Sequence, residues 1–189
     1  MFRRALLAAL ALSAGGGAAL SQEVAELRLR GAGGVERTDV GSGWRLLIES
    51  DLWMHGENSP GFVGFGLRAA TSFDRNGDIG RRRLIDGDLY LAPAYDIGDF
   101  RLFAAPSIGL ESLTQLDYWN GEGYQGTFIH FALSIGVHYR WQRLELSLVG
   151  TGTYYIAETP TDPTLLTKPL FPGGWSFSLD FAVGYIAPL

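Results

Sequence analysis

The 189-residue sequence contains no cysteine, which excludes disulfide bonds, thiolate metal ligands and cysteine nucleophiles. Charged residues make up only 19% of the chain and proline fills only 8 positions, whereas glycine fills 26. This composition excludes an acidic disordered tail, collagen and a coiled coil. The net charge of −5 argues against nucleic acid as a partner. The length allows one domain with its own core, or one compact membrane body.

The first 21 residues are predicted to be a signal peptide that is cleaved after export. Arg3 and Arg4 form a positive segment, an apolar stretch covers residues 5–12, and small residues precede the expected cut after Ser21. An uncleaved anchor helix is the weaker alternative, because the apolar stretch is far shorter than the roughly 20 residues that a membrane span needs. Residues 22–189 then form a single mature domain.

Apolar and polar residues alternate along most of the mature chain. The alternation is most regular over residues 126–141, 144–156 and 175–185, and weaker versions of it begin near Glu26, Trp44 and other points in the first half. A period of two residues predicts β-strands. Eight such segments occur, and none has a helical period. No uninterrupted apolar run in the mature chain can span a membrane as a helix, so any membrane span must be a closed barrel.

The connections between these segments alternate in length. Tight hairpins are expected near residues 96–99 and 140–143, and the join at residues 55–60 is also short. Long polar loops are expected at residues 34–42, 74–83, 112–125 and 158–174. If all long loops lie on one side, this is the long–short alternation of outer-membrane barrels, in which the long loops are external.

Side-chain size indicates which face looks outward. One face carries bulky groups such as Phe131 and Phe181, and the other is rich in small residues such as Gly66, Ser134 and Ser178. The interior of an eight-stranded barrel is only just wide enough for side chains to fill it. We therefore predict an all-β fold, an eight-stranded antiparallel up-and-down transmembrane β-barrel with the bulky face in lipid. A soluble ligand-binding barrel of the lipocalin type is the alternative, because it too has one apolar face.

With this pattern from about Val24 to Tyr185, the chain resembles the small eight-stranded outer-membrane barrel proteins of Gram-negative bacteria, the OmpA-like and OmpX-like group. The resemblance implies location in the outer membrane, lipids and lipopolysaccharide as surroundings, and insertion by the outer-membrane assembly machinery. The group usually ends in an aromatic residue that this machinery reads, and the last aromatic residue here is Tyr185. We expect a monomer.

Two sets of residues follow from the predicted faces. The inward charged residues and histidines are expected to form a network that plugs the lumen, because an isolated buried ion costs several kcal/mol; a proton or ion path is the alternative. The network comprises Glu26, Arg28, Arg30, Arg45, Glu49, Asp51, Arg68, Asp86, Asp88, Arg101, Glu111, His130, His138, Arg140, Glu145 and Asp180. Aromatic girdles at the two membrane interfaces are expected from Trp44, Tyr95, Tyr139, Trp141, Tyr154, Trp175 and Tyr185.

No catalytic residue, cofactor or metal site is predicted. His130 and His138 share the inward face but lie about 26 Å apart along one strand, so they cannot ligate one metal. Lipid A-modifying barrels, a palmitoyltransferase and a deacylase, have this general size, but the His-x-Ser pair of the deacylase is absent. His130 with Ser134 and an acid from a neighbouring strand is the arrangement that acyl transfer would require.

The segment Asp74-x-Asn76-x-Asp78 has the spacing of a calcium loop without its glycine and final glutamate.

The function favoured by the barrel pattern is an envelope-structural or surface-contact role through the external loops. A lipid A-modifying enzyme and a soluble periplasmic ligand-binding barrel are the alternatives.

Overall fold

A computed structural model describes residues 24–38, 41–55, 60–76, 80–116, 123–160 and 174–188 of the chain. It contains eight strands: β1 (Val24–Thr38), β2 (Gly41–His55), β3 (Gly61–Asn76), β4 (Gly80–Ile97), β5 (Phe100–Leu116), β6 (Gly123–Trp141), β7 (Leu144–Pro160) and β8 (Trp175–Pro188). The predicted signal peptide, residues 1–21, lies outside the described residues. Over the same described ranges, no helix is long and apolar enough to cross a membrane.

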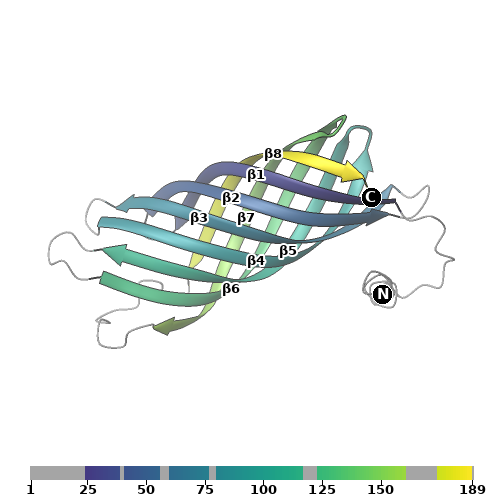
Figure 1. The fold of residues 1–189 in the computed structure, drawn as a ribbon. Helices are drawn as coiled ribbons and strands as arrows, with labels where there is room; N and C mark the ends of the chain where they lie inside the picture. Colours follow the sequence, from purple (N-terminus) through teal and green to yellow (C-terminus); the bar gives the residue numbers. More distant parts are fainter. Residues whose placement is uncertain are drawn as a thin grey trace.

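The strands form one closed barrel (Figure 1). Each strand pairs antiparallel with its neighbours in sequence, and β8 pairs with β1 to close the sheet, with Leu29 opposite Tyr185. Closure removes free sheet edges, so the backbone hydrogen bonds are made between strands, as a sheet surrounded by lipid requires. The predicted fold class is confirmed.

The barrel has two distinct ends. We call the end with the β2–β3, β4–β5 and β6–β7 connections the turn end, and the opposite end the loop end. At the turn end, the backbone N–H of Asp96 donates to Pro60 (2.9 Å), and that of Ile186 donates to Arg143 (2.8 Å). Each of these bonds ties a turn-end connection to a neighbouring strand, β4 or β8. The β4–β5 and β6–β7 turns each hold one residue in the left-handed region, Gly98 (φ 62°) and Gln142 (φ 58°).

Replacing Gln142 by glycine is expected to stabilise the barrel by about 1 kcal/mol, because a residue with a Cβ pays about that much in the left-handed region. The matched change Gly98→Ala should have the opposite effect; a Cβ there meets open space, so only backbone strain acts. Guanidinium unfolding midpoints of both variants in lipid vesicles check this pair. Two midpoints that move in the same direction would contradict it.

Three of the four loop-end connections are shorter than the loops predicted from the sequence, so those three predicted boundaries are wrong. Pairing continues to Thr38↔Gly41, Asn76↔Gly80 and Leu116↔Gly123, inside the predicted loops 34–42, 74–83 and 112–125. Polar and glycine-rich sequence was interpreted as loop. Strand pairing needs only backbone groups, so a hairpin can extend into water once the barrel wall sets its register.

The fourth loop agrees more closely with the prediction. The segment between β7 and β8, predicted at residues 158–174, begins after Pro160 and is the longest loop-end connection.

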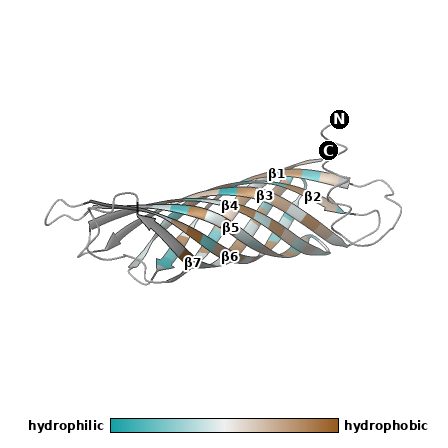
Figure 2. Cartoon of the chain, turned by 90° about the horizontal axis from the view of Figure 1, so that it is seen from below, coloured by the Kyte–Doolittle hydropathy of each residue, from teal (hydrophilic) through white to brown (hydrophobic). Residues whose placement is uncertain are grey.

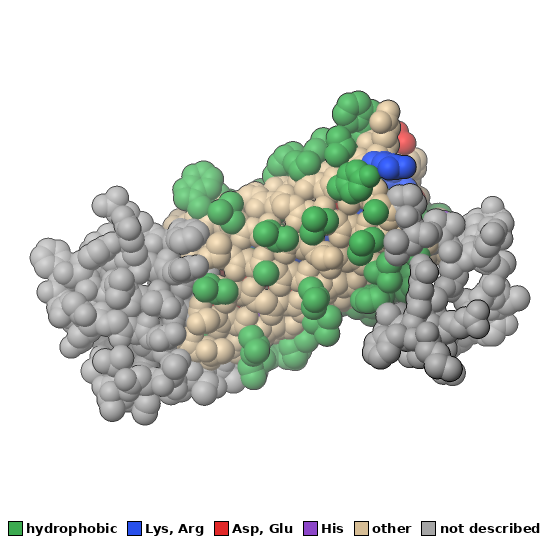
Figure 3. All heavy atoms as spheres, viewed as in Figure 1, with side chains coloured by type: hydrophobic (Ala, Val, Ile, Leu, Met, Phe, Trp, Pro, Cys, Tyr) green, Lys and Arg blue, Asp and Glu red, His purple; other side chains and the backbone are tan. Residues whose placement is uncertain are grey.

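The two faces of the wall have opposite chemistry. Large apolar side chains cover the outside, where Leu67 is 65% and Ile135 60% exposed. Figure 2 shows hydrophobic and hydrophilic positions alternating along the strands, and Figure 3 shows apolar side chains spread over the outer wall. The buried set contains most of the charged side chains of the strands. Because there is far more exposed apolar surface than a soluble barrel tolerates, the wall is suited to lipid.

The interior also contains large aromatic side chains, although the inward face is predicted to be rich in small residues. Trp53 is fully buried, and Phe62, Tyr90 and Phe103 pack with it in one apolar cluster. Space for Trp53 comes from Gly64 opposite it, where a Cβ would lie 2.6 Å from the indole ring. A glycine on one strand thus accommodates a large ring from the next, so the lumen need not be lined only by small residues.

Candidate functional site: the ionic lumen

The structure places the predicted network residues inside the barrel. All are buried except Arg140, which lies at the turn end and is 36% exposed. Buried charges must be paired, because desolvation costs several kcal/mol for each ion. The contacts divide into a group near the turn end and a group toward the loop end.

Arg28 and Arg30, adjacent inward positions of β1, organise the turn-end group. Arg28 binds Glu145 across the lumen (2.5 Å) and Glu26 on its own strand (2.7 Å). Arg30 makes ion pairs with Glu49 (3.1 Å), Asp51 and Glu145 (3.4 Å). One guanidinium therefore holds carboxylates from β2 and β7 together.

Glu26 gathers the cations at the turn-end rim. Its carboxylate lies 3.3 Å from Arg101 and 2.9 Å from Arg140, in addition to Arg28. Arg101 also makes a two-point contact with Asp96, its partner on β4 (2.5 and 2.9 Å). Guanidinium groups stack over the aromatic cluster as well, with Arg28 4.8 Å from the centre of Trp53. At the rim, arginine and acidic side chains therefore lie next to one another above the aromatic cluster.

Arg45 and Arg68 organise the loop-end group. Arg68 donates to Glu49 (2.5 Å) and Ser134 (3.0 Å) and lies 3.7 Å from Asp88. Arg45 lies 3.1 Å from Asp86. It also lies 3.8 Å from Glu36, a buried acid that the sequence analysis did not include and that accepts a hydrogen bond from Ser72. Asp180 accepts a hydrogen bond from Ser178.

His138 is held by contacts that do not form a catalytic triad. Its Nδ1 faces both Ser147 Oγ (2.7 Å) and Glu145 Oε1 (3.4 Å), whereas a triad places the serine and the acid on opposite nitrogens. Arg30 NH1 lies 3.0 Å from Nε2 and can only donate. The ring also stacks on Phe103 at 4.2 Å. These contacts fix the imidazole as a packing and hydrogen-bonding group.

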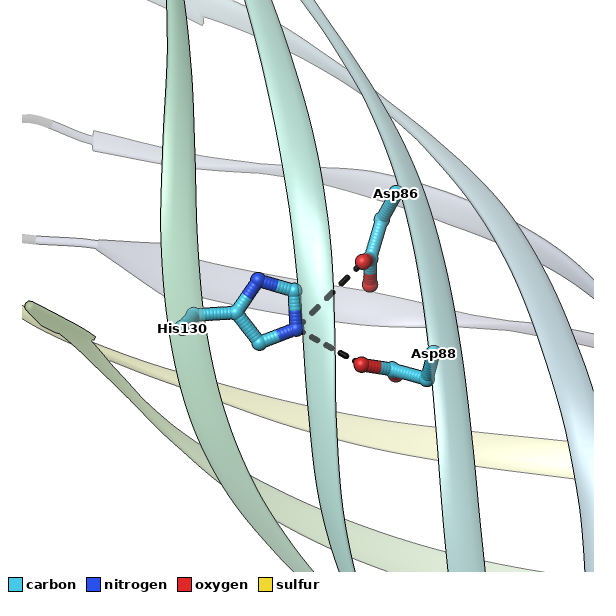
Figure 4. Close-up of side chains that lie close together, drawn as sticks. All are labelled: Asp86, Asp88 and His130. Carbon is cyan, nitrogen blue, oxygen red and sulfur yellow. Dashed lines mark hydrogen bonds and ion pairs between the residues drawn. The ribbon is translucent and has the colours of Figure 1, made fainter. Parts of the chain in front are cut away.

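His130 lies on β6, and its side chain extends across β5 to two carboxylates on β4. Its Nε2 lies 2.7 Å from Asp88 Oδ1 and 3.4 Å from Asp86 Oδ1 (Figure 4). The Ser134 hydroxyl binds Thr151 (2.8 Å) and Arg68 instead, so the Ser134–His130 contact that acyl transfer would need is not among the hydrogen bonds of the described residues. The strand period predicts that Asp86, Asp88 and His130 all face inward, but it does not predict that they meet.

Several uncharged side chains complete the network and were not anticipated. Tyr90 donates to Asp51 (2.7 Å), and Tyr155 donates to Glu111 (2.8 Å). The Ser147 hydroxyl contacts His138 (2.7 Å), and the Ser176 hydroxyl contacts Tyr155 (3.2 Å). Their inward positions were readable from the strand period, but their partners depend on the register between strands.

The aromatic residues predicted for the girdles are all on the outer wall, where Trp44 is 72% and Trp141 61% exposed. Tyr154 and Trp175 lie side by side near the loop end, with ring centres 4.8 Å apart. At the turn end, Arg143 donates to the Tyr185 hydroxyl (3.3 Å). Contact of the girdle residues with lipid headgroups stays a prediction. The remaining two, also exposed, are Tyr95 and Tyr139.

Comparison with known proteins gives a clear result for the fold only. No family model and no curated protein matches the sequence. Among solved structures, Neisserial surface protein A superposes with a TM-score of 0.53 at 11% identity, over 87% of this chain and 99% of that one. The attachment invasion locus protein Ail of Yersinia pestis gives 0.51 at 11%, over 88% and 100%. The outer membrane enzyme PagL gives 0.53 at 16%, over 82% and 97%.

The chain has the fold of the small eight-stranded outer-membrane β-barrels. That fold, with a closed wall, an apolar exterior and a charged interior, places the protein in the outer membrane. The fold alone does not select a function, because both a surface protein and an enzyme occur among these neighbours. The function must be argued from the lumen.

Proposed function

We propose that this protein is a structural barrel of the outer membrane that has a plugged lumen and makes surface contacts through its external loops. The observation that supports this most directly is the closure of the lumen. Trp53 and Ser134 are 0% exposed and Arg28 is 1% exposed, although all three point to the barrel interior. These side chains, which would line an open pore, are packed away from water, and this burial supports a lumen without a path for solutes.

Catalysis on a lipid would require a nucleophile and a base that substrate can reach. His130 and His138 are each 1% exposed and are engaged with charged partners. We therefore propose a non-enzymatic role, in preference to a lipid A-modifying enzyme or a soluble ligand-binding barrel. The exterior contacts outer-membrane lipid and lipopolysaccharide, the assembly machinery inserts the chain, and the barrel functions as a monomer.

The surface contacts are assigned to the two longest predicted loops. Residues 117–122 and 161–173 lie outside the described residues, and the strands beside them carry the chain to the loop end. Exposed loops on a rigid barrel are the usual places for binding. Replacing residues 117–122 by a glycine–serine segment should abolish surface binding to a partner while the folded barrel remains.

Planar-bilayer recording tests the plugged lumen. The purified, refolded barrel is expected to give no discrete conductance, since arginine–carboxylate pairs and aromatic rings fill its interior. Deleting the gene should increase the sensitivity of cells to detergent and leave the lipid A mass spectrum unchanged. Steps of conductance, or a change in lipid A acylation, would contradict the proposal.

A further inference from the structure

The loop-end half of the lumen contains a cluster that a plug does not need. Asp86 and Asp88 lie two residues apart on the inward face of β4, and His130 comes from β6. One ligand atom from each lies within 4.8 Å of the other two (Figure 4). His138 faces Arg30, Ser147 and one acid, Glu145, whereas His130 directs a single nitrogen at two acids.

The backbone of β5 is shaped to let these groups meet. Gly109 is paired with Asp88 on one side and with His130 on the other. A Cβ at Gly109 would lie 2.2 Å from Asp88 Oδ1 and 2.6 Å from His130 Nε2. Any other residue would therefore fill the space between the carboxylate and the imidazole. The β6–β7 register also shifts between Ile129 and His130, a bulge of the kind that redirects a side chain.

Buried atoms in and beside the cluster are left without hydrogen-bond partners. Among the described residues these atoms include Asp86 Oδ1, which faces His130 Nε2, and His130 Nδ1. Glu111, opposite Asp86 on β5, is only 3% exposed, and its Oε1 is also unpartnered. Buried carboxylate oxygens that accept no hydrogen bond are costly, and a cation among them would offset that cost.

The neighbouring arginines divide their contacts between these acids and others. Arg45 pairs with Asp86 but also with Glu36, and Arg68 pairs with Asp88 but more closely with Glu49. Near the turn end, by contrast, the arginines converge on the acids in multiple close contacts. Positive charge is therefore scarcer, among the described side chains, at the cluster around Asp86, Asp88 and Glu111.

We propose that Asp86, Asp88 and His130 bind one divalent transition-metal cation, beside the buried carboxylate of Glu111. Imidazole and carboxylate donors suit Zn²⁺, Co²⁺ or Mn²⁺, which bind such atoms at about 2.0–2.2 Å. Donors around one ion at that distance lie about 3.3 Å apart. The 3.4 Å between Asp86 Oδ1 and His130 Nε2 already matches this, and the Asp88 contact would widen slightly. The site goes beyond the structural role, which requires no ion.

Zinc binding by the full mature barrel tests the proposal. The chain is unfolded in chelator, refolded into detergent with or without Zn²⁺, and titrated by calorimetry and equilibrium dialysis. One Zn²⁺ per chain is expected. His130→Ala and Gly109→Ala should each weaken binding by about 100-fold or more, the first by removing a ligand and the second by filling the site. Co²⁺ in place of Zn²⁺ should give a visible absorption band that His130→Ala removes.

The other buried histidine provides the matched control. His138→Ala should bind Zn²⁺ as the native barrel does, because His138 lies outside the cluster. Heat-modifiable migration on gels establishes that each variant is folded, and Asp86→Asn replaces either cluster variant that fails to fold, with the same expected loss. The proposal is overturned if the native barrel takes up no stoichiometric Zn²⁺. Undiminished binding by the folded cluster variants, or an equal loss in His138→Ala, would overturn it as well.

Discussion

Replacing Arg30 by methionine is expected to lower the free energy of unfolding by about 3–5 kcal/mol, the cost of leaving buried charges without a partner. Arg30 makes ion pairs with Glu49, Asp51 and Glu145, and all four side chains are at most 5% exposed. Methionine has a similar length but no charge, so three carboxylates lose a shared cation while the packing volume changes little. Guanidinium titration of the refolded barrel in lipid vesicles measures the change.

Arg143→Met is the matched control for this experiment. Arg143 lies in the exposed β6–β7 turn, and its side chain donates to Tyr185 on the outer wall. It should change stability by less than about 0.5 kcal/mol, as surface substitutions usually do. Restoring neutrality in Arg30→Met with Glu145→Gln should recover part of the loss. Equal effects of the two arginine substitutions would show that the lumen network contributes no more than a surface contact.

Trp53→Ala is expected to cost about 3–5 kcal/mol, the range for removing a large buried aromatic side chain. Trp53 is fully buried and packs edge-on against Phe103 (6.4 Å) and His138 (6.1 Å). The wall cannot collapse onto the vacated space, because hydrogen bonds fix the spacing of its strands. The same unfolding titration checks the value.

Trp44→Ala serves as the comparison, since Trp44 is the most exposed tryptophan of the wall at 72%. Its loss leaves no internal cavity, and the expected change is smaller than that for Trp53→Ala. A larger loss from Trp44→Ala than from Trp53→Ala would mean that the barrel is stabilised from its outer wall and not by its packed interior.

The strand period predicted which face each residue occupies, and for a barrel this decides most of the fold. Residues such as Glu145, Ser147 and Thr151 are inward as expected, and their apolar neighbours Leu146 and Leu148 are outward. The period holds because each strand separates lipid from a charged interior, so every step along it changes the environment. The closed eight-stranded order then follows from hairpin connections and the need to remove edges.

The partners across the lumen could not be predicted in the same way. Arg28 and Glu145 are separated by 117 positions, and their contact depends on the register of every strand between them. A shift by two residues keeps the faces but changes all the pairs. The Asp86–Asp88–His130 cluster was missed for this reason, although the Asp-x-Asp spacing on one strand face was visible.

Interior aromatic residues were missed for a different reason. Trp53 and Phe103 interrupt the rule that small residues face inward, and each lies beside a glycine that leaves room for its ring, Gly64 and Gly136. Composition averaged over a face does not show such pairs, because the glycine and the ring come from different strands.

Oxygen and water accessibility along the outer wall is the most direct test of the orientation on which the structure and its proposed role depend. The native chain has no cysteine, so nitroxide labels can be attached to single cysteines at Ile135 and Leu148 without background. In lipid vesicles, spin-relaxation measurements should show frequent collisions with dissolved oxygen and few with a water-soluble nickel chelate at both positions. Frequent collisions with the nickel chelate at both positions would place this face in water and contradict the membrane barrel.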